Sequence, residues 1–313
     1  MKIGFLFAGQ GSQQVGMGKD LYDKYEEAKS VYERASKITG TDIANISFNG
    51  PENILNMTRN TQLAIVTESL AIVEILRNNN ITAVCSAGLS LGEYTALIED
   101  GVLDFETGIK LVCKRGQIMQ EMTPPGNWKM AAIIGLDAGK VNDICKLVTS
   151  GFVKPANFNT VGQIVISGEE NAVIEASELA KEQGARKISI LNTAGPFHTE
   201  KLEQCSKALK EELDKINLNS KESKVVKNID GLYYQSDNDI REVLSKHIMN
   251  PVRFTDCLKK MYDSGVDTFL EIGPGKVLSG FVKRMGFERP VNIFNINSVN
   301  TLDSFIEEVK KHE

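Results

Sequence analysis

Short apolar segments alternate with amphipathic ones along the first part of the chain. Apolar runs at 2–7 and 83–87 predict two strands, each followed by a glycine-containing loop. Apolar residues recur at helical spacing over 63–76, and further helices are predicted to begin near Leu91 and to span about 104–122. Strands that alternate with helices predict an α/β fold with a mostly parallel sheet, covered by helices on both faces.

The order of predicted elements changes after the breaker Thr123-Pro124-Pro125-Gly126. A β-α-β-β-α-β order follows, typical of a ferredoxin-like unit: strand 130–135, helix 137–149, strands 153–158 and 163–168, helix 171–181 and strand 186–191. Alternation then resumes, with helices at about 200–215 and 253–262, a strand at 268–272 and a helix from Lys276. We therefore expect a ferredoxin-like domain at 126–195, inserted into a large domain that comprises 1–125 and 196–313.

Composition places the chain among ordinary globular proteins. Its 313 residues suit one large or two unequal domains, and 42% hydrophobic with 25% charged residues exclude a disordered or fibrous chain. A net charge of −5 argues against a large nucleic-acid-binding surface. Apolar stretches fall short of the ~20 residues of a membrane helix, and 3–7 is too short for a signal peptide. Five cysteines form no C-x-x-C pair, so we expect neither a metal site nor disulfides, and a cytoplasmic location.

Gly88-Leu89-Ser90-Leu91-Gly92 matches the G-x-S-x-G pattern between a predicted strand and a predicted helix. The glycines permit a turn too tight for side chains, which exposes the Ser90 hydroxyl, and the Leu91 N–H at the helix start can bind an oxyanion. The alternative is a structural turn with an incidental serine. The strand–turn–helix setting favours a nucleophile and makes the large domain α/β-hydrolase-like.

A nucleophilic serine needs a base, and the chain has only three histidines. His198 lies in a loop after the last strand of the inserted unit and follows Ser90 in the chain, which is the hydrolase-type order. The alternative is a capping or core histidine. His247 is the rival base, but we expect it to end a surface helix, and we expect His312 to be solvated in the C-terminal tail.

Arg115 shares an apolar helical stripe with Leu111, Ile118 and Met122. A guanidinium there needs an anionic partner, because an unpaired buried charge is costly. The partner is either an internal Asp or Glu or a substrate carboxylate held by paired hydrogen bonds. The position of Arg115 on the helix, taken alone, slightly favours the internal partner.

Taken together, these motifs resemble the malonyl-CoA:acyl carrier protein transacylases. The matching stretches span nearly the whole chain in order: Gly9-Gln10-Gly11-Ser12-Gln13, Gly88 to Tyr94, Lys114-Arg115-Gly116, Asn157-Phe158-Asn159, His198, Asn250-Pro251-Val252 and Glu271 to Leu278. The resemblance implies transfer of malonyl from malonyl-CoA to the pantetheine thiol of acyl carrier protein. This transfer would be a ping-pong reaction that supplies fatty-acid elongation and uses no metal or redox cofactor.

The resemblance also implies a role for each candidate residue. Ser90 would carry the malonyl group and His198 would be the base, while the backbone N–H groups of Gln10 and Leu91 would form the oxyanion hole. Arg115 would grip the malonyl carboxylate, in place of an internal ion pair. A backbone carbonyl at or near His247 would orient His198, so that a dyad replaces a triad.

The sequence departs from the family pattern at three positions. Leu89 stands where most members have histidine, Ala8 where many have proline, and His247 where glutamine is common. We expect catalysis to survive, because the histidine replaced by Leu89 is not the base and only the carbonyl of His247 is required. If the His247 side chain turned inward, the assignment of a single base to His198 would be in doubt.

Acyl carrier proteins are acidic, so a basic docking patch is expected despite the negative net charge. Lys283 and Arg284, with Arg289 nearby, are candidates, although a solvated face explains these charges equally well. Phe197 beside His198 is expected to disfavour methylmalonyl. The alternative functions are an acyltransferase that serves a polyketide synthase, a serine thioesterase, and a non-catalytic carrier-binding protein. We expect a monomer without nucleic-acid or membrane partners.

Overall fold

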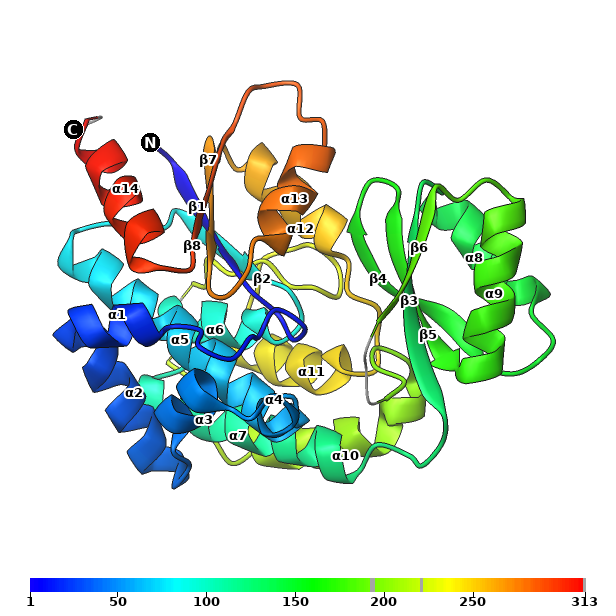
Figure 1. The fold of residues 1–313 in the computed structure, drawn as a ribbon, viewed down its shortest axis with the longest axis horizontal. Helices are drawn as coiled ribbons and strands as arrows, with labels where there is room; N and C mark the ends of the chain where they lie inside the picture. Colours follow the sequence, from blue (N-terminus) through cyan, green and yellow to red (C-terminus); the bar gives the residue numbers. More distant parts are fainter. Residues whose placement is uncertain (192–194, 220–221, 312–313) are drawn as a thin grey trace.

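The structure, a computed structural model, describes residues 1–191, 195–219 and 222–311. Its larger sheet is entirely parallel, with the strand order β2-β1-β7-β8. These strands are β1 (Ile3–Phe7), β2 (Cys85–Gly88), β7 (Thr268–Ile272) and β8 (Asn292–Ile296). Helices flank this sheet on both sides, as Figure 1 shows. The predicted parallel sheet is confirmed.

The helices around the larger sheet come from both ends of the chain and from its middle. In chain order they are α1 (Lys19–Lys24), α2 (Glu26–Thr39), α3 (Ile43–Asn49), α4 (Glu52–Leu55), α5 (Thr58–Asn78), α6 (Gly92–Glu99), α7 (Phe105–Glu121), a 3-10 turn (Glu200–Leu202), α10 (Glu203–Leu213), α11 (Asp237–His247), α12 (Phe254–Asp263), α13 (Val277–Arg284) and α14 (Val299–Lys310). Almost every residue of α5 is buried, which makes it the central helix of the domain.

Side chains of the inner strand β1 alternate between two apolar cores. Phe5 and Phe7 lie in the core that includes α5 and α6, whereas Leu6 lies in the core that includes α12 and α13. All residues of β1 and β7 are buried. Because both faces of the sheet are covered, the inner strand β1 can be a continuous run without polar residues, as parallel strands commonly are.

The smaller sheet is antiparallel, with the order β4-β5-β3-β6. It contains β3 (Trp128–Ile134), β4 (Val153–Thr160), β5 (Gln163–Glu169) and β6 (Lys187–Leu191), and α8 (Ala138–Leu147) and α9 (Glu170–Glu182) cover its outer face (Figure 1). This is the ferredoxin-like order. The α/β fold with a parallel sheet and a separate ferredoxin-like sheet is confirmed, while the domain boundaries at 126 and 195 remain our proposal.

Strand β4 connects the small sheet to helices that flank the larger one. Asn157 forms a β-bridge with Val252, and the Thr255 hydroxyl donates to the Phe158 carbonyl at 3.1 Å. The Thr160 hydroxyl likewise donates to the Phe281 carbonyl at 3.1 Å. These contacts fix the small sheet against α12 and α13.

Several elements were not predicted from the pattern of apolar residues. Strand β8 was missed because Asn292 and Asn295 interrupt its short apolar run at the sheet edge. The helices α1 to α4 and α14 were missed as well, only the end of α11 at His247 was expected, and α5 is longer than the predicted helix at 63–76. Among the described residues, no helix is long and apolar enough to cross a membrane. The same residues contain no cluster of His, Cys, Asp and Glu that could hold a metal ion.

Candidate active site

Ser90 lies on the sharp turn between β2 and α6. Its φ of 52° falls in the left-handed region, which residues other than glycine rarely adopt. The flanking glycines make the turn possible. A Cβ at Gly88 would lie 1.9 Å from the carbonyl carbon of Gly92, and a Cβ at Gly92 would lie 2.2 Å from the carbonyl oxygen of Phe7. The G-x-S-x-G pattern thus forms a strained elbow with the serine at its apex.

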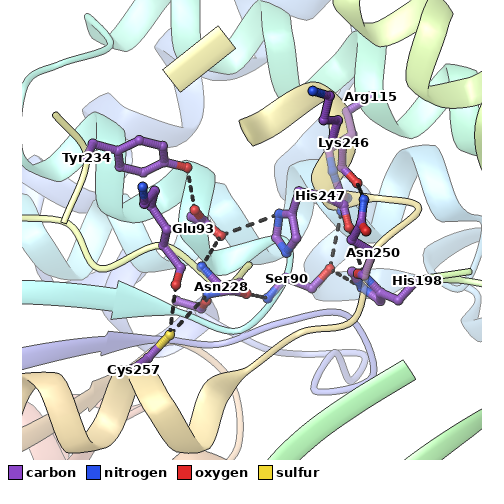
Figure 2. Close-up of polar contacts among 12 residues, drawn as sticks. Ser90, Glu93, Arg115, His198, Asn228, Tyr234, Lys246, His247, Asn250 and Cys257 are labelled. Atoms are coloured by element: carbon purple, nitrogen blue, oxygen red, sulfur yellow. Dashed lines mark hydrogen bonds and ion pairs between the residues drawn. The ribbon is translucent and has the colours of Figure 1, made fainter. Parts of the chain in front are cut away.

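The Ser90 hydroxyl contacts the imidazole of His198 (Figure 2), with 2.8 Å between Oγ and Nε2. The other ring nitrogen, Nδ1, lies 3.1 Å from the carbonyl oxygen of His247 and 3.0 Å from that of Asn250. Because both of these partners only accept hydrogen bonds, Nδ1 carries the proton and Nε2 presents its lone pair to Ser90. This tautomer allows His198 to act as a general base.

The surroundings of His198 keep its ring neutral. Burial and the positive charge of Arg115 lower the pKa of His198 to about 4, although the two carbonyl acceptors oppose the change. The backbone is also constrained, since His198 has a φ of 61° and its N–H donates to the Ile248 carbonyl at 3.0 Å. The ring is therefore unprotonated at neutral pH and faces the nucleophile.

His247 ends a helix as expected, but its side chain turns inward, which corrects the expectation of a surface position. It is fully buried at the end of α11, with Nδ1 3.4 Å from a carboxyl oxygen of Glu93 (Figure 2). Burial lowers the pKa of His247 well below its usual value and raises the pKa of Glu93 to about 8. The ring centres of His247 and His198 lie 5.3 Å apart, but only the His198 ring contacts Ser90. We therefore keep the proposal of His198 as the single base.

Arg115 reaches the nucleophile from α7. Its side chain is only 1% exposed, with Nη2 3.3 Å from the Ser90 Oγ and the guanidinium 5.1 Å from the ring centre of Tyr94. The internal Asp or Glu partner, which position alone slightly favoured, is absent from the described residues, and Nε has no hydrogen-bond partner among them. Burial lowers the pKa of Arg115, although the group stays cationic. A buried guanidinium beside a nucleophile can receive a substrate carboxylate.

The loop after β1 lies against the elbow. A Cβ at Gly9 would be 2.4 Å from the carbonyl oxygen of Leu89, and the Leu89 N–H donates to the Phe7 carbonyl at 3.0 Å. Gln10 follows directly after this close approach. Within the described residues, the backbone N–H groups of Gln10 and Leu91 donate to no other group. Backbone donors are rarely left unpaired inside a protein, so both are available for an oxyanion.

Two polar residues behind the elbow were not singled out in the sequence. Asn228 contacts the backbone of Ser90, 138 positions away, and Glu93 contacts both Asn228 and His247. Asn228 lies in an irregular stretch without periodicity, so no local signal marks it. Glu93 belongs to the motif around Ser90, but an acidic residue in the first turn of a helix usually indicates favourable interaction with the helix dipole only. His312 and residues 193–194 of the His198 loop lie outside the described residues.

The sequence matches the family model of the acyl transferase domain over residues 4–308. The chain belongs to the acyl transferase family. A malonyl CoA-acyl carrier protein transacylase of Bacillus subtilis (strain 168) is 40% identical over 312 residues, which cover 99% of this chain and 98% of the relative. The resemblance to these transacylases in the sequence motifs is confirmed.

Solved structures show the same acyl transferase fold. The malonyl CoA-acyl carrier protein transacylase of Clostridium perfringens ATCC 13124 has a TM-score of 0.94 and 42% identity, covering 100% of this chain and 98% of that one. A malonyl-transacylase in complex with a type II PKS acyl-carrier protein has a TM-score of 0.94 and 36% identity, covering 98% of this chain and 100% of that one.

Proposed function

We propose that this acyl transferase moves malonyl from malonyl-CoA to the pantetheine thiol of an acyl carrier protein, through a malonyl ester on Ser90. The observation that carries the proposal is the guanidinium of Arg115, which is buried, lacks a carboxylate partner in the described part of the chain and lies 3.3 Å from the Ser90 hydroxyl. A malonyl thioester brings a carboxylate to that position. The named relatives, at 36–42% identity over nearly the whole chain, support this substrate.

In the first half-reaction, the Ser90 hydroxyl attacks the thioester carbonyl. His198 accepts the hydroxyl proton at Nε2, which lies 2.8 Å from Oγ. The N–H groups of Gln10 and Leu91 bind the oxyanion that forms on the carbonyl oxygen. The intermediate then expels CoA, whose thiolate recovers the proton from His198, and malonyl remains as an ester on Ser90.

In the second half-reaction, the carrier thiol takes the place of CoA. His198 removes the thiol proton, the thiolate attacks the ester carbonyl, and the Ser90 oxygen leaves and recovers the proton. The malonyl carboxylate also helps the base. Because the charge of Arg115 lowers the pKa of His198, a carboxylate bound to that guanidinium would offset the effect and bring the pKa closer to its usual range.

Arg115 also gives a reason why malonyl-CoA should be preferred over acetyl-CoA. Acetyl-CoA has no carboxylate, so its binding would shield the guanidinium from water without supplying an anion. Phe197 is buried next in sequence to His198, and we keep the prediction that it disfavours methylmalonyl. Thioester exchange needs only a nucleophile, a base and an oxyanion hole, so the proposed mechanism uses no metal or redox cofactor.

The acidic carrier protein requires a positively charged docking surface. Lys283 and Arg284 are exposed in the last turn of α13, and we propose them as part of that surface. Arg289 contributes less, because its guanidinium donates to the carbonyl oxygens of Val266 at 2.7 Å and Tyr262 at 3.2 Å. A monomeric, cytoplasmic enzyme without nucleic-acid or membrane partners remains our expectation from the sequence.

Service to a polyketide synthase is the second candidate function. The observation that favours it is the similarity to a malonyl-transacylase in complex with a type II PKS acyl-carrier protein. The two candidates share every chemical step and differ in the carrier protein alone. Comparison of kcat/KM for a fatty-acid and a polyketide carrier protein would separate them.

The malonyl ester on Ser90 can be tested by intact mass. Protein incubated with malonyl-CoA alone should gain one malonyl group, which Ser90→Ala should abolish and which added carrier protein should remove. Acetyl-CoA under the same conditions should leave much less adduct. Free malonate without an adduct would favour the thioesterase, and an inert protein would favour a non-catalytic carrier-binding protein.

A further inference from the structure

A segment far from the elbow in sequence runs beside β2. Ser86 forms a parallel bridge with Val225, its N–H donates to the Lys224 carbonyl at 3.0 Å, and its carbonyl accepts from the Val226 N–H at 2.9 Å. Because the segment is parallel to β2 in this register, Asn228 is brought level with the residues that follow β2, where the elbow begins. Asn228 is fully buried there.

The carboxamide of Asn228 makes two hydrogen bonds to the elbow (Figure 2). Its Oδ1 accepts from the Ser90 N–H at 2.8 Å, and its Nδ2 donates to the Gly88 carbonyl at 2.8 Å. One side chain therefore supplies hydrogen-bond partners for the backbone carbonyl before Leu89 and for the backbone N–H after it. These bonds hold the two peptide groups that flank Leu89, and the second of them is the peptide group from which the left-handed φ of Ser90, 52°, begins.

The backbone of Asn228 is itself held from two helices. Its N–H donates to the Glu93 carboxyl group on α6 at 3.1 Å, and its carbonyl accepts from the Arg253 N–H before α12 at 2.7 Å. The Tyr234 hydroxyl donates to the other Glu93 oxygen. Asn228 is therefore a rigid support, because its backbone and its side chain have partners at every polar atom.

We propose that Asn228 is a positioning residue that holds the elbow so that the Ser90 hydroxyl faces His198 and the Leu91 N–H faces the oxyanion. The proposal rests on the proposed role of Ser90 as the nucleophile. Asn228 does not touch the reacting atoms and acts through the backbone of Ser90. Loss of the carboxamide leaves a strained turn free to relax, which moves Oγ away from its position 2.8 Å from Nε2.

Replacement by aspartate distinguishes positioning from simple packing. A protonated aspartic acid matches asparagine, since one oxygen accepts from the Ser90 N–H and the hydroxyl donates to the Gly88 carbonyl. An ionised aspartate directs a negative oxygen at that carbonyl. The titratable groups that face this position are Glu93 from α6 and Cys257 from α12, with Sγ 3.8 Å from Nδ2, and His247 lies behind Glu93. Burial and the neighbouring carboxyl group raise the pKa of an aspartic acid here.

The test compares the wild type with Asn228→Ala and Asn228→Asp between roughly pH 5 and 9. Two single-turnover rate constants are measured: acylation of Ser90 by malonyl-CoA, and modification of Ser90 by a small sulfonyl fluoride. Asn228→Ala should lower both by about 100-fold with little change in the half-saturating malonyl-CoA concentration. Asn228→Asp should approach the wild type at low pH and lose at least about tenfold relative to it at high pH.

Asn60→Asp is the matched control. Asn60 is also buried and donates to a backbone carbonyl, that of Ile54, at 2.8 Å, so it reports the general effect of the same substitution. Its rate relative to the wild type should not vary with pH. If Asn228→Ala does not fold, the nearly isosteric Asn228→Asp decides the question.

Two results would overturn the proposal: wild-type rate constants in Asn228→Ala, or a constant ratio of Asn228→Asp to wild type across the pH range. A different result would count against the malonyl donor instead. If malonyl-CoA fails to acylate the wild type while the sulfonyl fluoride shows the predicted pattern, the positioning role stands and the proposed substrate falls.

Discussion

Replacement of Arg115 by alanine should remove the preference for malonyl and leave the transfer chemistry in place. The guanidinium is 1% exposed and has no carboxylate partner in the described residues, so a bound malonyl group would be its main anionic contact. Two charge-assisted hydrogen bonds of about 1.5–2 kcal/mol each give about 3–4 kcal/mol. This corresponds to a decrease of roughly 10²- to 10³-fold in kcat/KM for malonyl-CoA.

The assay is the rate of CoA release with malonyl-CoA and with acetyl-CoA as donors. Acetyl transfer should be unchanged or faster in Arg115→Ala, because acetyl never used the guanidinium. Arg115→Lys should also lose most malonyl transfer, since an ammonium cannot make the paired contact. Lys114→Ala, an exposed neighbour on the same helix, is the matched control and should resemble the wild type with both donors.

The reasoning about Arg115 has a clear point of failure. Equal losses with malonyl-CoA and acetyl-CoA would show that Arg115 supports the fold or the nucleophile, not the carboxylate. The contact between Nη2 and the Ser90 Oγ, at 3.3 Å, makes this outcome physically possible, so both donors must be measured.

Three further predictions follow from the geometry of the site. The kcat/KM for acylation, which reports the free protein, should be constant near neutral pH and fall as the pH drops toward about 4. Burial and the charge of Arg115 lower the pKa of His198 to that value, and the base must be unprotonated; a fall in kcat/KM already near pH 6.5 would contradict this. Gly92→Ala should lower the free energy of unfolding by about 3 kcal/mol in thermal or urea unfolding, since its Cβ would lie 2.2 Å from a backbone oxygen. Gly280→Ala, with its nearest neighbour at 3.8 Å, should not destabilise the fold. Charge reversal of Lys283 and Arg284 should raise the KM for carrier protein about tenfold and leave acylation by malonyl-CoA unchanged. An unchanged KM would exclude this docking surface.

Local chemistry explains which parts of the fold could be predicted. The inner strand β1 was found because burial on both faces leaves it without polar residues, and β7 was found because its short run, which includes Phe269, Leu270 and Ile272, ends at Gly273-Pro274-Gly275. The ferredoxin-like sheet was found because each of its elements is bounded by a clear breaker or change of period. Strand β8 at the sheet edge needs less apolar surface, so its two asparagines hid it.

In the candidate site, too, features set by neighbouring residues could be predicted and contacts between distant segments could not. The elbow could be predicted because Gly88 and Gly92 must both be glycine for steric reasons that act over five residues. The partners of Arg115 and the inward turn of His247 depend on packing between α7, α11 and α6, which no single segment records. Asn228 reaches the elbow only through the register of one β-bridge, and this explains why it was missed.

The central claim is that a malonyl group on Ser90 passes to a carrier thiol and not to water. The most direct measurement isolates the malonyl form of the protein, adds carrier protein that bears pantetheine, and follows both products by mass. We predict that the label moves to the carrier thiol much faster than free malonate forms without carrier. Release of malonate at the same rate with and without carrier protein would contradict the claim and identify a hydrolase.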